Sequence, residues 1–194
     1  MWRFLGLAFS LVFVSLSSQA NEQQELWQAL KDGGKVVMMR HATVDQSIGE
    51  SFVLDESCFT EKNLNDFGEQ QAKAIAQVLS ENHIKIGHVL TSPYCRTKDT
   101  AKLAFGRFEI SPLLHLVRSI PVETGVANLE QVRKLLSDYQ GVDNLFMVSH
   151  RPNIADITNI RLQPAQMVVF EPLGDGLFDI LGVLDVSVPA AVKN

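Results

Sequence analysis

The stretch KVVMMRHATVD, residues 35–45, changes character over the length of one strand. Four consecutive apolar residues, 36–39, are followed by Arg40 and His41. A run without a polar face is typical of a strand buried on both sides, as in a parallel sheet covered by helices. We therefore expect a core strand that delivers Arg40 and His41 to the edge of a sheet, where a functional site can form.

Strands and helices alternate along the remaining sequence. Strands are predicted at 35–40, 86–93 and 144–150, with a final pair within 165–184, and helices at 21–34, 65–82, 94–106, 128–139 and 152–160. Apolar residues recur at helical spacing in the helices, whereas the first three strands are short apolar runs. This order predicts an α/β fold, a three-layer sandwich whose mainly parallel central sheet has helices on both faces.

The first 20 residues have the pattern of a secretory signal peptide. Arg3 precedes an apolar run over 4–16, and small residues follow it. The run is shorter than the roughly 20 apolar residues of a transmembrane helix. We expect a cleaved leader at 1–20 and a single domain over 21–194, in a periplasmic or secreted protein without stable membrane insertion after processing. A retained N-terminal anchor is the alternative.

Composition and charge narrow the class of protein. The chain has 194 residues, of which 46% are hydrophobic and 20% charged, as expected for a globular domain with a core. Its net charge of −5 argues against a nucleic-acid partner.

Cys58 and Cys95 are the two cysteines of the chain. An exported protein meets an oxidising compartment, so we expect them to form a disulfide, which would contribute roughly 3–4 kcal/mol to stability on the chain-entropy estimate. Two separate thiols are the alternative.

Polar side chains follow three of the predicted strands. Arg40 and His41 end the first, TSPYCR brings Arg96 to the end of the second, and His150 ends the third. Because the carboxyl ends of parallel strands meet at one edge of an open sheet, these side chains are expected to share a pocket. Two guanidinium groups suit a phosphate, and an imidazole can accept a phosphoryl group or stabilise its charge.

A metal site is the chemical alternative for the two histidines. The neighbouring arginines would repel a cation, and no carboxylate or cysteine at the same strand ends would complete the ligand set. We therefore expect neither a metal nor an organic cofactor.

These motifs carry a resemblance to a known family. RHA at the first strand end, SPYCRTKDTA at the second and SHRPN at the third resemble the histidine phosphatase superfamily, which has the phosphoglycerate mutase-like fold. NLNDFGEQQA, between the first two motifs, extends the similarity. The leader, CFTEKNLNDFG and SPYCRTKDTAKLAFG are similar to exported bacterial members, among them lipopolysaccharide core heptose phosphatase-like proteins.

The resemblance implies a role for each matching residue. His41 would be the nucleophile that becomes phosphohistidine, Arg40 and Arg96 would hold the phosphate, and His150 would stabilise its charge. Ala42 stands where the family usually has glycine. Thr43 either donates its hydroxyl to the phosphate or is an ordinary loop residue.

A phosphomonoester also needs a proton donor for its leaving group. Many family members have an acid after the second arginine, and Glu123 is the candidate here, with Glu109 and Asp156 as competitors. Phosphohistidine has a good leaving group already, so a member without the acid would favour that substrate. Arg151, next to His150, either reaches an anionic substrate or faces outward.

The sequence thus predicts an exported phosphatase that hydrolyses a phosphomonoester through phosphohistidine on His41. Its partner would be a phosphorylated small molecule or an envelope glycan. A mutase or a phosphohistidine-protein phosphatase is the second interpretation. A third is a catalytically weak envelope protein that only binds phosphate or glycans.

Overall fold

The computed structural model describes residues 8–50 and 52–186. Its helices are α1 (Ala8–Asp32), α2 (Asp66–Glu81), α3 (Cys95–Phe105), α4 (Val122–Asp138) and α5 (Arg151–Thr158), with 3-10 turns η1 (Pro112–Leu114) and η2 (Val117–Ser119). Its strands are β1 (Val36–Arg40), β2 (Ile86–Thr91), β3 (Glu109–Ile110), β4 (Asn144–Ser149), β5 (Met167–Gly174) and β6 (Leu177–Leu184).

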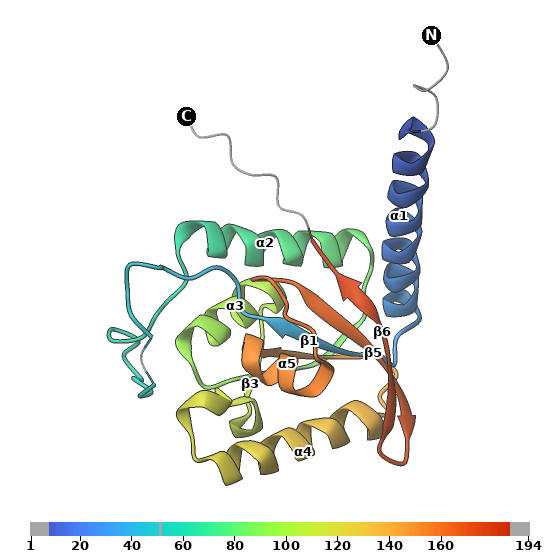
Figure 1. Ribbon diagram of the computed structural model, residues 1–194. Coiled ribbons are helices and arrows are strands. Elements are labelled where there is room, and N and C mark those ends of the chain that lie inside the picture. Colours follow the sequence, from blue (N-terminus) through green and yellow to red (C-terminus); the bar gives the residue numbers. More distant parts are fainter. Residues whose placement is uncertain (1–7, 51, 187–194) are drawn as a thin grey trace.

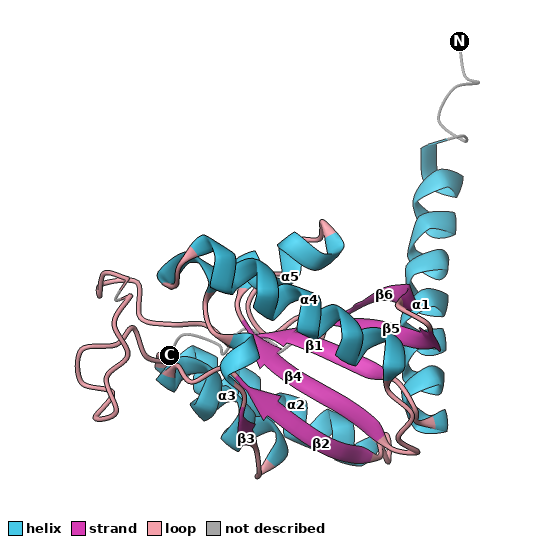
Figure 2. Ribbon diagram, turned by 90° about the horizontal axis from the view of Figure 1, so that it is seen from below, coloured by secondary structure: helices cyan, strands magenta, loops and turns pink. Residues whose placement is uncertain are grey.

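The six strands form one mixed sheet in the order β3-β2-β4-β1-β5-β6. β3, β2, β4 and β1 are parallel to one another, whereas β5 is antiparallel to β1 and β6 is antiparallel to β5. Figure 2 shows helices on both faces of this sheet. The predicted α/β fold with a mainly parallel sheet is confirmed.

Each face of the sheet packs against its own set of helices. Alternate residues of β1 point to opposite sides, so Val37 and Met39 join a core cluster with α1, α2 and α3, whereas Val36 and Met38 join a cluster with α4 and α5. All four side chains are fully buried. The absence of a polar face in this stretch therefore results from burial on both sides.

Helix α1 is longer than the predicted helix over 21–34. Residues 1–7 of the expected leader lie outside the described residues, and 8–20 form the first part of α1, which projects from the body of the fold (Figure 1). The later part is packed: Leu26 and Leu30 are buried, and the Gln23 side chain donates to the Val183 carbonyl of β6. Within the described part of the chain, no helix is long and apolar enough to cross a membrane.

Asn144 connects several elements at the edge of the sheet where β1 and β2 begin. Its buried side-chain amide donates to the carbonyls of Leu30 at 2.7 Å and Lys85 at 2.9 Å, and its oxygen accepts from the Lys35 amide at 3.1 Å. These bonds satisfy backbone groups at the end of α1 and at the starts of β1 and β2. The strands therefore begin in a fixed register, and their carboxyl ends meet at the opposite edge of the sheet.

Candidate active site

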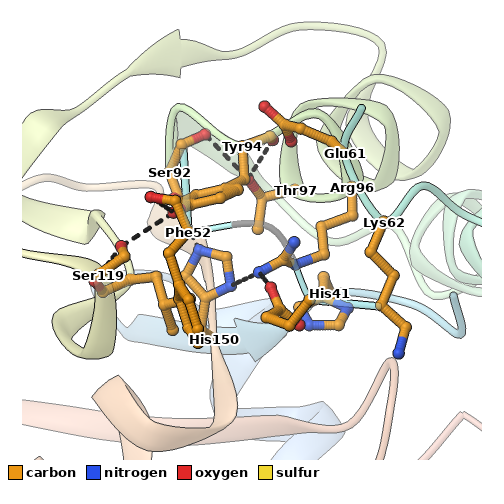
Figure 3. A network of polar contacts seen from close by, with 12 residues as sticks. His41, Phe52, Glu61, Lys62, Ser92, Tyr94, Arg96, Thr97, Ser119 and His150 are labelled. Carbon is orange, nitrogen blue, oxygen red and sulfur yellow. Dashed lines mark hydrogen bonds and ion pairs between the residues drawn. The ribbon is translucent and has the colours of Figure 1, made fainter. Parts of the chain in front are cut away.

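The carboxyl ends of β1, β2 and β4 bring three of the expected residues together (Figure 3). His41 and His150 have ring centroids 5.6 Å apart, and Arg96 lies in the first turn of α3. Only 7% of His41, 2% of Arg96 and 1% of His150 is exposed to solvent. The His41 amide donates to the Ser149 carbonyl at 3.0 Å, so pairing between β1 and β4 fixes the spacing of the two histidines.

The His41 ring is held in one orientation by its own backbone. Its Nδ1 lies 2.8 Å from the Ala42 carbonyl oxygen. A carbonyl oxygen can only accept, so Nδ1 carries the proton and Nε2 keeps its lone pair. Burial, together with the charge of Arg96, lowers the pKa of His41 to about 3. His41 is therefore neutral at ordinary pH, as a nucleophile must be.

His150 is held by two polar neighbours. Its Nε2 lies 2.8 Å from the Ser92 hydroxyl and its Nδ1 lies 3.5 Å from Arg96 Nη2. Since a guanidinium only donates, Nδ1 accepts and Nε2–H donates to Ser92. Burial, followed by the charges of His41 and Arg96, lowers the pKa of His150 well below its usual value.

Arg96 is a buried cation with spare donors. Its Nη2 donates to Glu50 Oε1 at 2.7 Å, and its guanidinium carbon lies 4.5 Å from the centre of the Tyr94 ring. Nε and Nη1 of Arg96 are buried without a hydrogen-bond partner among the described residues. Buried donors are rarely unpaired, so these two mark a position where an anion can bind.

Arg40 contributes a further unpaired donor at the same edge. Its Nη1 donates to the Leu162 carbonyl at 2.9 Å, while its buried Nε has no partner in the described chain. Burial, with the charges of Arg151 and Arg96, lowers the pKa of Arg40 to about 10, so it stays charged at neutral pH. A phosphate beside His41 would meet cationic donors from two directions.

This arrangement agrees with the comparison against known families. A sequence model of the histidine phosphatase superfamily (branch 1) matches residues 36–115, which include Arg40, His41 and Arg96. Residues 36–115 thus match the histidine phosphatase superfamily, and this match supports a phosphatase activity. No curated protein matches the chain.

Solved structures of three phosphatases share the fold. The protein histidine phosphatase SixA, complexed with tungstate, is 16% identical with a TM-score of 0.58, over 77% of this chain and 96% of its own. The alpha-ribazole phosphatase from Shigella flexneri is 17% identical with a TM-score of 0.56, over 82% and 100%. A mycobacterial glucosyl-3-phosphoglycerate phosphatase, in complex with VO3, is 16% identical with a TM-score of 0.54, over 79% and 99%.

The loop between β1 and α2 is attached to the candidate site by a disulfide. Cys58 and Cys95 are bonded, as expected, with their Cα atoms 5.8 Å apart. Glu61, which is 1% exposed, accepts from the Cys95 amide at 2.7 Å and from the Asp55 amide at 3.2 Å. Since Cys95 directly precedes Arg96, both links fix the loop against the residue that carries the buried guanidinium.

The remaining predicted residues lie less centrally. The Thr43 hydroxyl donates to Gln71 Oε1 at 2.7 Å, so its proton is already used in the structure. Glu123 is exposed in the first turn of α4, and no hydrogen bond or ion pair joins it to the described residues of the site. Of its competitors, Glu109 lies 3.2 Å from His88, and Asp156 is exposed on α5.

Sequence reasoning missed four residues of the site: Glu50, Glu61, Ser92 and Tyr94. Ser92 and Tyr94 stand in the TSPYCR motif at a strand end, so their position was available as a signal. The two glutamates lie in an irregular polar loop, where no periodicity distinguishes a buried carboxylate from an exposed one. Among the residues that the structure describes, no group of three or more histidines, cysteines or acids could hold a metal.

Proposed function

We propose that the protein is an exported phosphatase that hydrolyses a phosphomonoester through a phosphohistidine on His41. The observation that carries the proposal is the neutral His41 ring with its free Nε2, beside buried and unpaired donors of Arg40 and Arg96. Solved neighbours in complex with tungstate or VO3, two phosphate-like oxyanions, are consistent with such a pocket.

The reaction would proceed in two displacements. His41 Nε2 attacks phosphorus, the ester P–O bond breaks, and the departing alcohol oxygen takes a proton. Water then attacks the same phosphorus, the P–N bond breaks, and His41 leaves with its lone pair restored while phosphate is released. Arg40 and Arg96 would hold the non-bridging oxygens through both steps.

His150 would change its protonation state as phosphate binds. In the free site, burial and neighbouring charges keep it neutral. A doubly charged phosphate nearby favours the protonated ring, because an opposite charge stabilises the imidazolium. The protonated ring could then donate to an oxygen of the transferring group.

The proton for the leaving group has two candidate sources. Glu123 is the donor implied by the family resemblance, but Glu50 is the carboxylate that contacts Arg96. Glu123→Gln and Glu50→Gln should be compared on an alkyl phosphate and on para-nitrophenyl phosphate, whose leaving group needs little protonation. The donor is the residue whose variant loses kcat on the alkyl ester alone; equal effects on both esters would exclude that residue.

The nucleophile is tested by His41→Asn, with His88→Gln as the matched control. His88 is exposed and lies near the start of β2, away from the carboxyl end of the strand where the site forms. We expect the His41 variant to lose at least about 10³-fold in kcat on para-nitrophenyl phosphate. The control should retain activity. A phosphoenzyme that is acid-labile and base-stable should form in the wild type and be absent from the variant. Activity that persists in His41→Asn would overturn the assignment.

A phosphohistidine protein is the second candidate substrate. The exposed position of Glu123 favours it, because a phosphohistidine substrate needs no acid for its leaving group. SixA is named as a protein histidine phosphatase, and it shares the fold. Turnover of a phosphohistidine peptide well above that of alkyl phosphates would select this function.

Export is part of the proposal. The leader pattern at 1–20 and the Cys58–Cys95 disulfide are both compatible with an oxidising compartment outside the cytoplasm. N-terminal sequencing of the protein recovered from the cell envelope should begin at Asn21. A protein that retains Met1 would contradict the cleaved leader.

A further inference from the structure

A second cationic hollow lies outside the phosphate pocket. It has a volume of about 350 Å³ and is lined by Arg118, Arg151, Pro152, Ala155, Asp156 and Arg161; we call it the arginine hollow. The three arginines come from η2, the start of α5 and the loop that follows α5. The mechanism proposed for His41 uses none of them.

The guanidiniums of the arginine hollow are unpaired. Arg118, Arg151 and Arg161 are exposed, and none has a hydrogen-bond or ion-pair partner within the described part of the chain. Other surface arginines are used differently: Arg133 donates to the Asp156 carbonyl, and Arg107 donates to two carbonyls of β2. The three guanidiniums of the hollow therefore make no hydrogen bond or ion pair with the described residues that would stabilise the fold.

Two arginines of the hollow are sequence neighbours of residues that build the phosphate pocket. Arg151 directly follows His150, and Arg161 directly precedes Leu162, whose carbonyl accepts from Arg40. Consecutive Cα atoms are about 3.8 Å apart, so the backbone at the edge of the hollow continues directly into that of the phosphate pocket. The charge of Arg151 also lowers the pKa of Arg40, which agrees with this proximity.

Arg118 is placed by its two neighbours in the chain. The Val117 amide donates to the Asn153 side chain of α5, and the Ser119 hydroxyl accepts from the Tyr94 hydroxyl. The Tyr94 ring in turn lies 5.2 Å from the His150 ring. The η2 turn therefore connects the α5 side of the hollow to the aromatic wall of the phosphate pocket.

The charge of the hollow contrasts with that of the whole chain. The protein has a net charge of −5, but the hollow gathers three cations around one carboxylate, Asp156. Such a concentration of like charge costs free energy unless an anion binds there. A guanidinium fork matches a phosphate or a carboxylate, and a volume of this size fits part of a small molecule rather than a macromolecular surface.

We propose that the arginine hollow binds a second anionic group of the substrate while the first phosphate lies against His41. This inference rests on the proposed phosphatase function and narrows its substrate class. The substrate would be a small molecule that carries its reactive phosphate and a second phosphate or carboxylate. Arg118, Arg151 and Arg161 would then determine specificity without contacting the reacting atoms.

The test compares glucose 6-phosphate with two related compounds that carry a second anion. Binding of glucose 6-phosphate, glucose 1,6-bisphosphate and 6-phosphogluconate to the His41→Asn protein is measured by calorimetry, so that no turnover occurs. The doubly anionic sugars should bind about 10-fold or more tightly than glucose 6-phosphate. Adding Arg118→Gln and Arg161→Gln should abolish this preference, whereas adding Lys134→Gln, an exposed cation of α4, should preserve it.

The same variants in a wild-type His41 background separate this proposal from the proposed function. Arg118→Gln with Arg161→Gln should raise KM for the doubly anionic sugars and leave kcat and the KM of glucose 6-phosphate within about twofold. Equal affinity of all three sugars for the His41→Asn protein would overturn the arginine hollow. Loss of the preference in the Lys134 control would do the same. Absence of turnover with an intact binding preference would instead refute the phosphatase proposal alone.

Discussion

Glu50 pairs with Arg96, the cation that would bind the substrate phosphate, and this leads to a quantitative prediction. Its carboxylate accepts from Arg96 Nη2 at 2.7 Å, and the Arg96 side chain is 3% exposed whereas that of Glu50 is 37% exposed. An incoming phosphate must therefore displace Glu50 or share Arg96 with it. Replacing the carboxylate by an amide, Glu50→Gln, keeps the shape and removes the competing charge.

The size of the effect follows from this one contact. A hydrogen bond between charged groups contributes about 1.5–3 kcal/mol, and the exposed end of the pair reduces this to about 1–2 kcal/mol. Such a free energy corresponds to a factor of about 5–30 in an equilibrium constant. The Glu50→Gln protein should therefore bind an oxyanion more tightly than the wild type by about that factor.

Vanadate is the suitable probe, because its binding needs no proton donor. Its dissociation constant is measured by calorimetry for the wild type, for Glu50→Gln and for Glu56→Gln. Glu56 is an exposed acid of the same loop and has no ion pair in the described structure, so it controls for the general loss of negative charge. Vanadate that binds Glu50→Gln no more tightly than Glu56→Gln would refute the competition between Glu50 and phosphate.

Three further predictions concern the fold around the site. Replacing Cys58 and Cys95 by Ala should lower the free energy of unfolding by about 3–4 kcal/mol in denaturant titrations, and a reductant should then have no additional effect. Because the pKa of His41 is lowered to about 3, the unfolded chain binds more protons between about pH 3 and 6.5, so stability falls as the pH falls through that window. His41→Gln should reduce this slope by up to about 1.4 kcal/mol per pH unit, and an unchanged slope would contradict the burial of a neutral ring. Gly68→Ala should lower the free energy of unfolding by about 1–3 kcal/mol, because the added Cβ would lie 1.9 Å from a backbone oxygen. Gly125→Ala, whose added Cβ would have its nearest neighbour at 3.7 Å, should instead stabilise its helix by about 0.5–1 kcal/mol. The melting temperatures of the two variants should therefore shift in opposite directions.

The sequence was sufficient for the parts of the site that regular elements position. Arg40 and His41 end a strand whose four buried residues have no polar face, and Arg96 and His150 follow the next two parallel strands. Hydrophobic periodicity locates such strand ends, and sheet topology then brings them to one edge. For these four side chains, local pattern and global fold agree.

Contacts made by the long loop could not be predicted in the same way. Glu50 meets Arg96, and Glu61 meets the amide of Cys95, across more than thirty positions of sequence in an irregular segment. The start of α4 was also misplaced, at 128 instead of Val122. Gly125 has a low helix propensity, so the sequence pattern does not indicate a helix there. In the structure, packing of Gly125 against η2 stabilises this first turn of α4.

The hydrogen bonds that hold α1 against the sheet have a consequence for maturation. The tertiary hydrogen bonds of Gln23 to Val183 and Asp185, and of the Leu30 carbonyl to Asn144, all lie after position 20. A peptidase acting after residue 20 would thus detach the projecting stretch and leave the helix seated on β6. The rest of α1 and all of strand β1 lie between this processing point and His41, so precursor and mature protein would present the same geometry at the candidate site.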